Sequence, residues 1–95
     1  MVDNGDGRTA LVIGGASGIG WATAKALAGD GCRVIVADLN GDGAAARAKE
    51  LGSPHTGDEV NVTDEDSVAA LFERTGSLDV VVTTAGAVRY ATGAS

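Results

Sequence analysis

The sequence predicts an α/β fold in which a parallel, doubly wound β-sheet is covered by helices on both faces. Short apolar runs alternate along the chain with segments of helical pattern, as in strands joined by helical crossovers. A glycine-rich turn joins the first apolar run to the first helical segment, and an aspartate ends the second apolar run. Right-handed crossovers leave few topologies, and the chain accounts for about half of a doubly wound sheet, as βαβαβαβ.

The first strand and the first helix are expected on either side of the glycine-rich turn. Residues 10–13 are a continuous apolar run, which suits a strand that is buried on both faces. Residues 19–28 contain several helix formers (Ala, Lys and Leu), and Gly29 and Gly31 follow as stop signals. This strand-turn-helix unit is the context in which a glycine-rich turn is informative.

The second strand and helix repeat this pattern. Residues 33–38 are rich in β-branched side chains and predict another strand. Residues 44–51 predict a helix that ends before Gly52, with Asp42 or Asn40 near its start.

The remaining elements have weaker signals. Residues 59–62 predict a third strand, which is shorter and more polar than the first two. Thr63 is expected to cap a third helix, whose first turn carries acidic side chains at residues 64–66, where the helix dipole favours negative charge. Residues 78–82 predict a fourth strand, with Asp79 as its one polar interruption.

Composition narrows the class of protein. The 95 residues suffice for one small domain, and their net charge of −6 without a Lys/Arg cluster argues against nucleic acid and anionic membranes as partners. No apolar run approaches the ~20 residues of a membrane span. Cys32 is the single cysteine and is interpreted as small core filler. Together these features favour a cytoplasmic protein.

Few side chains are candidates for chemistry of their own. His55 is the single histidine, and we expect it in an exposed loop. No second His or Cys stands at ligand spacing, so no metal site is predicted. The acidic residues 64–66 and Glu73 are interpreted as a solvated helix start rather than as acid/base catalysts. No nucleophile motif is found, and no catalytic residue is predicted within the chain.

The turn from Gly14 to Gly20 is the main functional signal. Gly14 permits a tight turn, Gly18 permits close approach of the backbone to a pyrophosphate, and Gly20 lets the helix pack on the sheet. Amides near Ser17, Gly18 and Ile19 would point at phosphate oxygens. The alternative is a set of ordinary packing glycines. A Walker-type site is a poor match, because no Gly-Lys-Ser/Thr ends the turn.

Asp38 predicts which dinucleotide this turn would bind. It lies 18 residues after Gly20, near the spacing expected for the acid that receives the adenosine ribose hydroxyls. Its carboxylate would repel a 2′-phosphate, and neither Leu39 nor Ser17 offers a positive charge there. The expected cofactor is therefore NAD rather than NADP. The alternative is an aspartate that only caps the following loop.

Four segments of the chain, in this order and spacing, resemble the short-chain dehydrogenase/reductase family. They are Gly14-x-x-x-Gly18-Ile19-Gly20, Asp38, Asn61-Val62-Thr63-Asp64 and Thr83-Thr84-Ala85-Gly86. The resemblance implies a Rossmann fold, in which Asn61 and Val62 flank the adenine ring. It also implies that Thr84, Ala85 and Gly86 lie beneath the cofactor.

Three positions depart from the family pattern. Ile13 and Thr83 replace a Thr and an Asn, so the side-chain link between the turn and the fourth strand is expected to be missing. Asn61 replaces an Asp that accepts a hydrogen bond from the adenine amino group. Its amide oxygen can still accept, more weakly.

The resemblance implies that residues 1–95 are the N-terminal NAD(H)-binding portion of a single Rossmann-fold domain, truncated before the catalytic segment. Tyr90 cannot serve as the family's catalytic Tyr, because Ala94 stands where the Lys is needed. The implied parent is a homo-oligomeric oxidoreductase, a tetramer or dimer, that interconverts a secondary alcohol and a ketone. The alternative is a non-catalytic dinucleotide-binding module or an isolated half-fold. A Tyr-x-x-x-Lys after Ser95 would decide for the enzyme.

Overall fold

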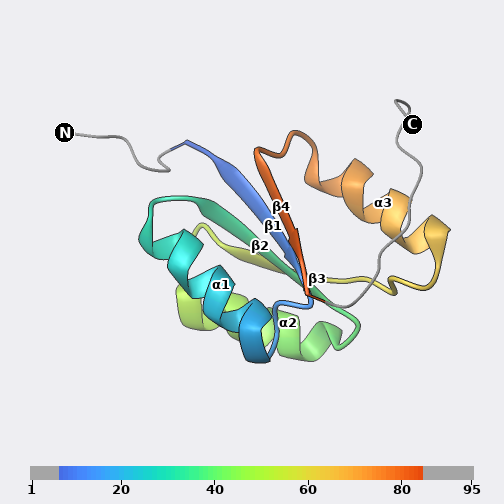
Figure 1. Ribbon diagram of the computed structural model, residues 1–95, viewed down its shortest axis with the longest axis horizontal. Helices are drawn as coiled ribbons and strands as arrows, with labels where there is room; N and C mark the ends of the chain where they lie inside the picture. The colour runs from blue at the N-terminus through green and yellow to red at the C-terminus, as the bar shows by residue number, and fades with distance from the viewer. Residues whose placement is uncertain (1–6, 85–95) are drawn as a thin grey trace.

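The computed structural model describes residues 7–84 and confirms the predicted α/β fold (Figure 1). Strands and helices alternate as β1 (Thr9–Ile13), α1 (Gly18–Gly29), β2 (Arg33–Asp38), α2 (Gly41–Leu51), β3 (Thr56–Glu59), α3 (Glu65–Thr75) and β4 (Val80–Thr83). All strand pairs are parallel, and the strand order is β3-β2-β1-β4. Within the described residues, no helix has the length and apolar character needed to cross a membrane.

The sheet divides the apolar side chains between two faces. Leu11 of β1 lies opposite Ile35 of β2 and Val81 of β4. Because neighbouring side chains on a strand point to opposite faces, alternate residues of β1 and β2 serve different helices. Figure 1 shows α1 and α2 on one side of the sheet and α3 on the other.

Each face has its own hydrophobic core. Under α1 and α2 the buried residues are Ala10, Val12, Ala24, Cys32, Val34, Val36 and Ala44. Under α3 they are Leu11, Ile13, Ile35, Ala37, Val60, Val68 and Leu71. A fully buried side chain such as Leu11 contributes about 1.5–3 kcal/mol relative to an exposed one. Because all four strands are parallel, their carboxyl ends lie at one edge of the sheet.

The predicted position of the third strand is wrong. The structure places β3 at Thr56–Glu59, paired with Ile35–Asp38, whereas the prediction was residues 59–62. This edge strand is polar, and a Cβ on Gly57 would lie 2.5 Å from the carbonyl oxygen of Ala44 in α2. Val60 lies just after the strand and is buried in the core under α3. The apolar pattern therefore marked a buried segment after the strand and not the strand itself.

Two predicted helix starts also differ from the structure. Asp64, not Thr63, caps α3, because its side chain accepts hydrogen bonds from the amides of Asp66 and Ser67. Helix α2 begins at Gly41, three residues before the predicted start, since Asn40 accepts from the amide of Gly43. Both caps satisfy first-turn amides that the helix itself leaves without partners.

Candidate functional site

The carboxyl ends of β1, β2 and β4 meet at one edge of the sheet. Strand β1 is central, with β2 on one side and β4 on the other. The helix after β1 covers one face of the sheet, and the helix before β4 covers the opposite face (Figure 1). In open parallel sheets, two neighbouring strands whose connecting helices lie on opposite faces leave a crevice between them, outside the carboxyl ends of the strands. The glycine-rich turn follows β1 at this edge.

The turn is tight at Gly14, as predicted. Gly14 has a φ of +84° and Gly18 a φ of +60°, a region that L side chains rarely adopt. The amide of Gly14 donates to the carbonyl oxygen of Ala37 at 2.8 Å, which holds the turn against β2. A Cβ on Gly20 would collide with the carbonyl oxygen of Gly14. The glycines are thus needed at these positions both for the turn and for the close packing of α1 against it.

Among residues 7–84, no side chain caps the N-terminus of α1. Ser17 is the N-cap residue, but its side chain makes no capping hydrogen bond. The first amides of an α-helix have no partner within the helix, so a capping ligand or water must satisfy them. Ile19 is 78% exposed and Leu39 is 66% exposed, and they are large apolar side chains on the turn side of the sheet. A helix N-terminus of this kind favours a phosphate group.

Asp38 joins the end of β2 to the turn. Its Oδ2 atom accepts a hydrogen bond from the amide of Ala16 at 3.0 Å, and its Oδ1 atom accepts from the amide of Asn40 at 3.1 Å. Asp38 therefore caps the loop that follows β2. A carboxylate offers about four acceptor positions, so these two bonds leave capacity for hydroxyl donors.

Arg47 is a residue of this region that sequence reasoning missed. It lies on α2, and its Nε atom donates to the carbonyl oxygen of Ala16 at 2.9 Å. Its guanidinium also lies over the ring of Trp21, with 4.6 Å between Cζ and the ring centroid. Residues 16 and 47 are far apart in the chain, and no spacing rule links them. Only the packing of α2 beside α1 brings them together.

The link between the turn and the fourth strand is present, contrary to the expectation from Ile13 and Thr83. The hydroxyl of Thr84 donates to the carbonyl oxygen of Gly14 at 3.2 Å. The amide of Thr84 donates to the carbonyl oxygen of Ile13 at 2.9 Å. The linking side chain belongs to Thr84, the residue after Thr83. Ala85 and Gly86, the other predicted residues of this segment, lie outside the described residues.

Asn61 and Val62 follow β3 on the same edge of the sheet. The Oδ1 atom of Asn61 accepts from the amide of Thr63 at 3.0 Å and from its hydroxyl at 2.6 Å. A carbonyl oxygen has two lone pairs, so both acceptor positions of Asn61 are engaged within the loop. This arrangement does not favour the expected contact with an adenine amino group. Val62 is partly buried and packs on the core under α3.

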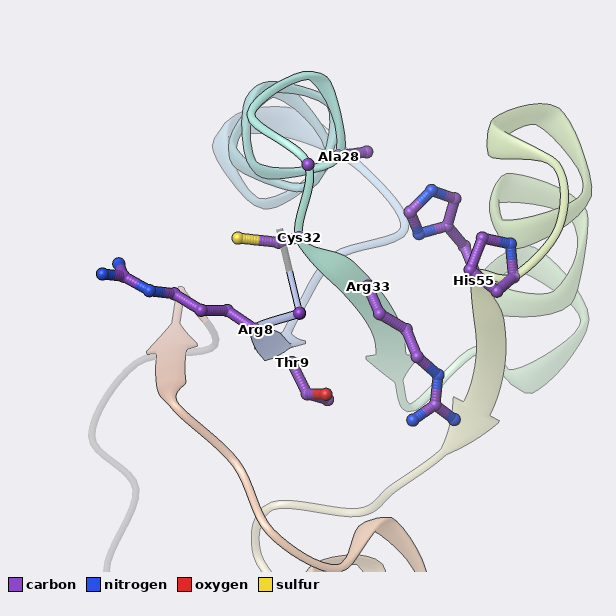
Figure 2. A pocket seen from close by; sticks show the side chains of 9 residues that line it. Arg8, Thr9, Ala28, Cys32, Arg33 and His55 are labelled. Carbon is purple, nitrogen blue, oxygen red and sulfur yellow. The ribbon is translucent and has the colours of Figure 1, made fainter. Parts of the chain in front are cut away.

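His55 lies in the loop before β3, as expected, but the expectation that it is exposed is wrong. His55 is half-buried, and its Nδ1 atom accepts from the amide of Val34 at 2.9 Å. It borders a hollow of about 450 Å³ at the amino-terminal edge of the sheet, opposite the glycine turn. Figure 2 shows the side chains of Arg8 and Cys32 pointing to one side and that of Arg33 pointing to the other, so the three do not converge on one point. Cys32 is buried in the core, as predicted.

Comparisons with known proteins agree with this geometry. The family described as short chain dehydrogenase matches residues 8–94. A sorbitol dehydrogenase of Cereibacter sphaeroides is 44% identical over 84 residues, which cover 84% of this chain and 33% of that protein. A D-threitol dehydrogenase of Mycolicibacterium smegmatis is 43% identical over 93 residues, which cover 90% of this chain and 36% of that protein.

A solved structure described as a short chain dehydrogenase/reductase family protein has a TM-score of 0.83 and 32% identity. The match covers 88% of this chain and 36% of that one. The chain spans about a third of the length of the curated relatives it matches. With the family match running over nearly all of its sequence and the fold in agreement, the chain belongs to the short-chain dehydrogenase/reductase family.

Proposed function

We propose that this chain binds NAD(H) and is the cofactor-binding part of an oxidoreductase that interconverts a secondary alcohol and a ketone. The observation that carries the proposal is the open N-terminus of α1 beside Asp38, at the carboxyl edge of the sheet. The amides that follow Ser17 would bind the pyrophosphate, helped by the positive end of the helix dipole. The turn fits this ligand, because the space beside Gly18 is open and a side chain there would be strained.

The same geometry supports NAD(H) over NADP(H). The Asp38 carboxylate has remaining acceptor capacity for the adenosine ribose hydroxyls, and it would repel a 2′-phosphate. Arg47, a cation that contacts the turn, already binds the Ala16 carbonyl oxygen and the Glu50 carboxylate. The Glu50 carboxylate therefore partly compensates the positive charge of Arg47, which makes Arg47 a weaker partner for a 2′-phosphate.

Ile19 and Leu39 support the placement of the rest of the cofactor. Each is a large apolar side chain that is mostly exposed in this structure; Leu39 follows β2, and Ile19 lies in the first turn of α1. Bound dinucleotide would cover both and remove their apolar surface from water, which is favourable. We place the adenine near Leu39 and the nicotinamide half beyond Ile19.

The substrate class is proposed from the relatives. Their names record a sorbitol dehydrogenase and a D-threitol dehydrogenase, which act on small polyhydroxy alcohols. We assign a small secondary alcohol or its ketone to the whole protein. When bound, the nicotinamide accepts or supplies the hydride. Residues of this chain hold and orient the cofactor.

Substitution of Asp38 tests the choice of cofactor. In the intact protein, Asp38→Asn keeps one acceptor for the Ala16 amide and removes the charge. We expect the affinity for NADPH to rise and that for NADH to fall, so that the NADH/NADPH affinity ratio narrows about tenfold, equivalent to about 1.4 kcal/mol. Calorimetric titration with each dinucleotide measures the ratio.

Asp79→Asn is the matched control. It removes the same charge from the opposite edge of the sheet, where Asp79 accepts from the amide of Thr9 at 2.9 Å. Its affinity ratio should equal that of the unmodified protein. An unchanged ratio in Asp38→Asn contradicts the assignment of NAD(H). Binding of NADH without turnover of any polyol or secondary alcohol would favour a non-catalytic binding module.

A further inference from the structure

Arg47 contacts three different partners from its position on α2. Its Nε atom donates to the carbonyl oxygen of Ala16 at 2.9 Å, and its Nη1 atom donates to Glu50 Oε2 at 3.0 Å. Its guanidinium stacks over the ring of Trp21 on α1. Glu50 and Trp21 both restrict the orientation of the guanidinium, so the donor to Ala16 is held in place. The side chain of Arg47 is about one-third exposed, so most of its surface is in contact with the protein.

Ala16 is held from both sides. Its amide donates to the Asp38 carboxylate at the end of β2, and its carbonyl oxygen accepts from Arg47 on α2. Ala16 and Ser17 stand between Gly15 and Gly18, and glycine has more backbone freedom to lose on ordering than any other residue. Two anchors on one residue therefore restrict the segment of the turn that would otherwise be the most mobile.

The contact from Arg47 has a directional consequence for Ser17. The peptide that joins Ala16 to Ser17 is planar and trans, so its C=O and its N–H point in opposite directions. When Arg47 fixes the Ala16 carbonyl oxygen toward α2, it also directs the amide of Ser17 away from α2. It further keeps a carbonyl dipole, which would repel an anion, from turning into the crevice.

We propose that Arg47 is a positioning residue that holds the Ala16–Ser17 peptide in the orientation required to bind the pyrophosphate. This inference rests on the proposed function. Arg47 acts through the backbone of the turn and does not itself touch the cofactor. Trp21 and Glu50 are the side chains that hold Arg47 in place. The turn is thereby ordered before the ligand arrives, and binding does not have to supply that ordering.

The inference is tested with Arg47→Gln and Arg47→Lys in the intact protein. For Arg47→Gln we expect the dissociation constant of NADH to rise about tenfold. Binding of adenosine, which has no phosphate, should change by less than twofold. Arg47→Lys keeps the charge but cannot donate from the Nε position while stacking on Trp21, so it should recover only part of the affinity. Calorimetric titration with NADH and adenosine measures both constants.

Arg74→Gln is the matched control. Arg74 is also a helical arginine in a surface ion pair, with 2.9 Å between its Nη2 atom and Asp58 Oδ1, but it lies on α3. Its loss should lower the melting temperature about as much as Arg47→Gln does and leave the NADH affinity unchanged. The inference is overturned if Arg47→Gln binds NADH normally, if adenosine binding falls equally, or if Arg47→Lys recovers full affinity. Failure of the unmodified protein to bind NADH would instead remove the proposed function itself.

Discussion

The hydroxyl of Thr84 donates to the carbonyl oxygen of Gly14 at 3.2 Å and so ties the end of β4 to the turn after β1. The Gly14 amide is in turn bound to the carbonyl oxygen of Ala37 in β2. Three neighbouring strands thus converge on one glycine. Because the turn is held from both sides, its shape depends on the sheet and not only on its own sequence.

Thr84→Val in the intact protein tests this tie. The substitution keeps the shape of the side chain and removes the hydroxyl, so we expect the free energy of unfolding to fall by about 0.5–1 kcal/mol. If the tie also shapes the turn, the NADH dissociation constant should rise about twofold to fivefold. Urea unfolding and calorimetric titration measure the two effects.

Thr75→Val is the control for Thr84. Its hydroxyl donates to the carbonyl oxygen of Phe72 within α3, at 3.1 Å, away from the turn. This variant should lose a similar amount of stability and bind NADH normally. Equal NADH binding by both valine variants would show that the Thr84 hydroxyl does not shape the turn.

Gly20→Ala should be strongly destabilising. A Cβ at this position would collide with the carbonyl oxygen of Gly14, which is backbone and cannot rotate away. We expect a loss of about 3 kcal/mol in the free energy of unfolding, at the upper end of the usual cost of overpacking. Urea unfolding measures the loss.

Gly29→Ala provides the comparison on the same helix. No atom lies within 4 Å of the Cβ position at Gly29, and the residue is helical. Alanine there should stabilise the protein by about 0.4–1 kcal/mol, because it restricts the unfolded chain. If Gly20→Ala and Gly29→Ala changed the free energy of unfolding by the same amount, in either direction, the close approach of α1 to the turn would be contradicted.

His55→Ala should destabilise the opposite edge of the sheet. The variant leaves the amide of Val34 without its 2.9 Å acceptor, at an expected cost of about 1–3 kcal/mol. His55→Asn offers an oxygen at similar reach and should recover most of the loss. Urea unfolding at neutral pH compares the two variants. If His55→Ala has the same free energy of unfolding as the unmodified protein, water replaces the imidazole as acceptor and the hydrogen bond to Val34 does not contribute to stability.

Local sequence determined much of this protein. The apolar runs of β1 and β2 are buried on both faces, and such runs need no knowledge of distant residues to be recognised. The tight turn at Gly14 was likewise predicted from the glycine spacing, and its φ is positive, a region that glycine adopts readily. Asp38 was placed at the end of β2 because it closes the β-branched run of residues 33–38.

Tertiary structure decided the features that depend on residues far apart in the chain. Strand β3 could not be located from its apolar pattern, since an edge strand beneath α2 needs Gly57 and polar neighbours, while Val60 is buried only by the later packing of α3. The contacts of Thr84 with Gly14 and of Arg47 with Ala16 join residues 70 and 31 positions apart. Periodicity and turn rules describe neighbours along the chain. The Thr84 bond exists because the parallel sheet brings the carboxyl ends of β1 and β4 to one edge, and the Arg47 bond exists because α2 packs beside α1.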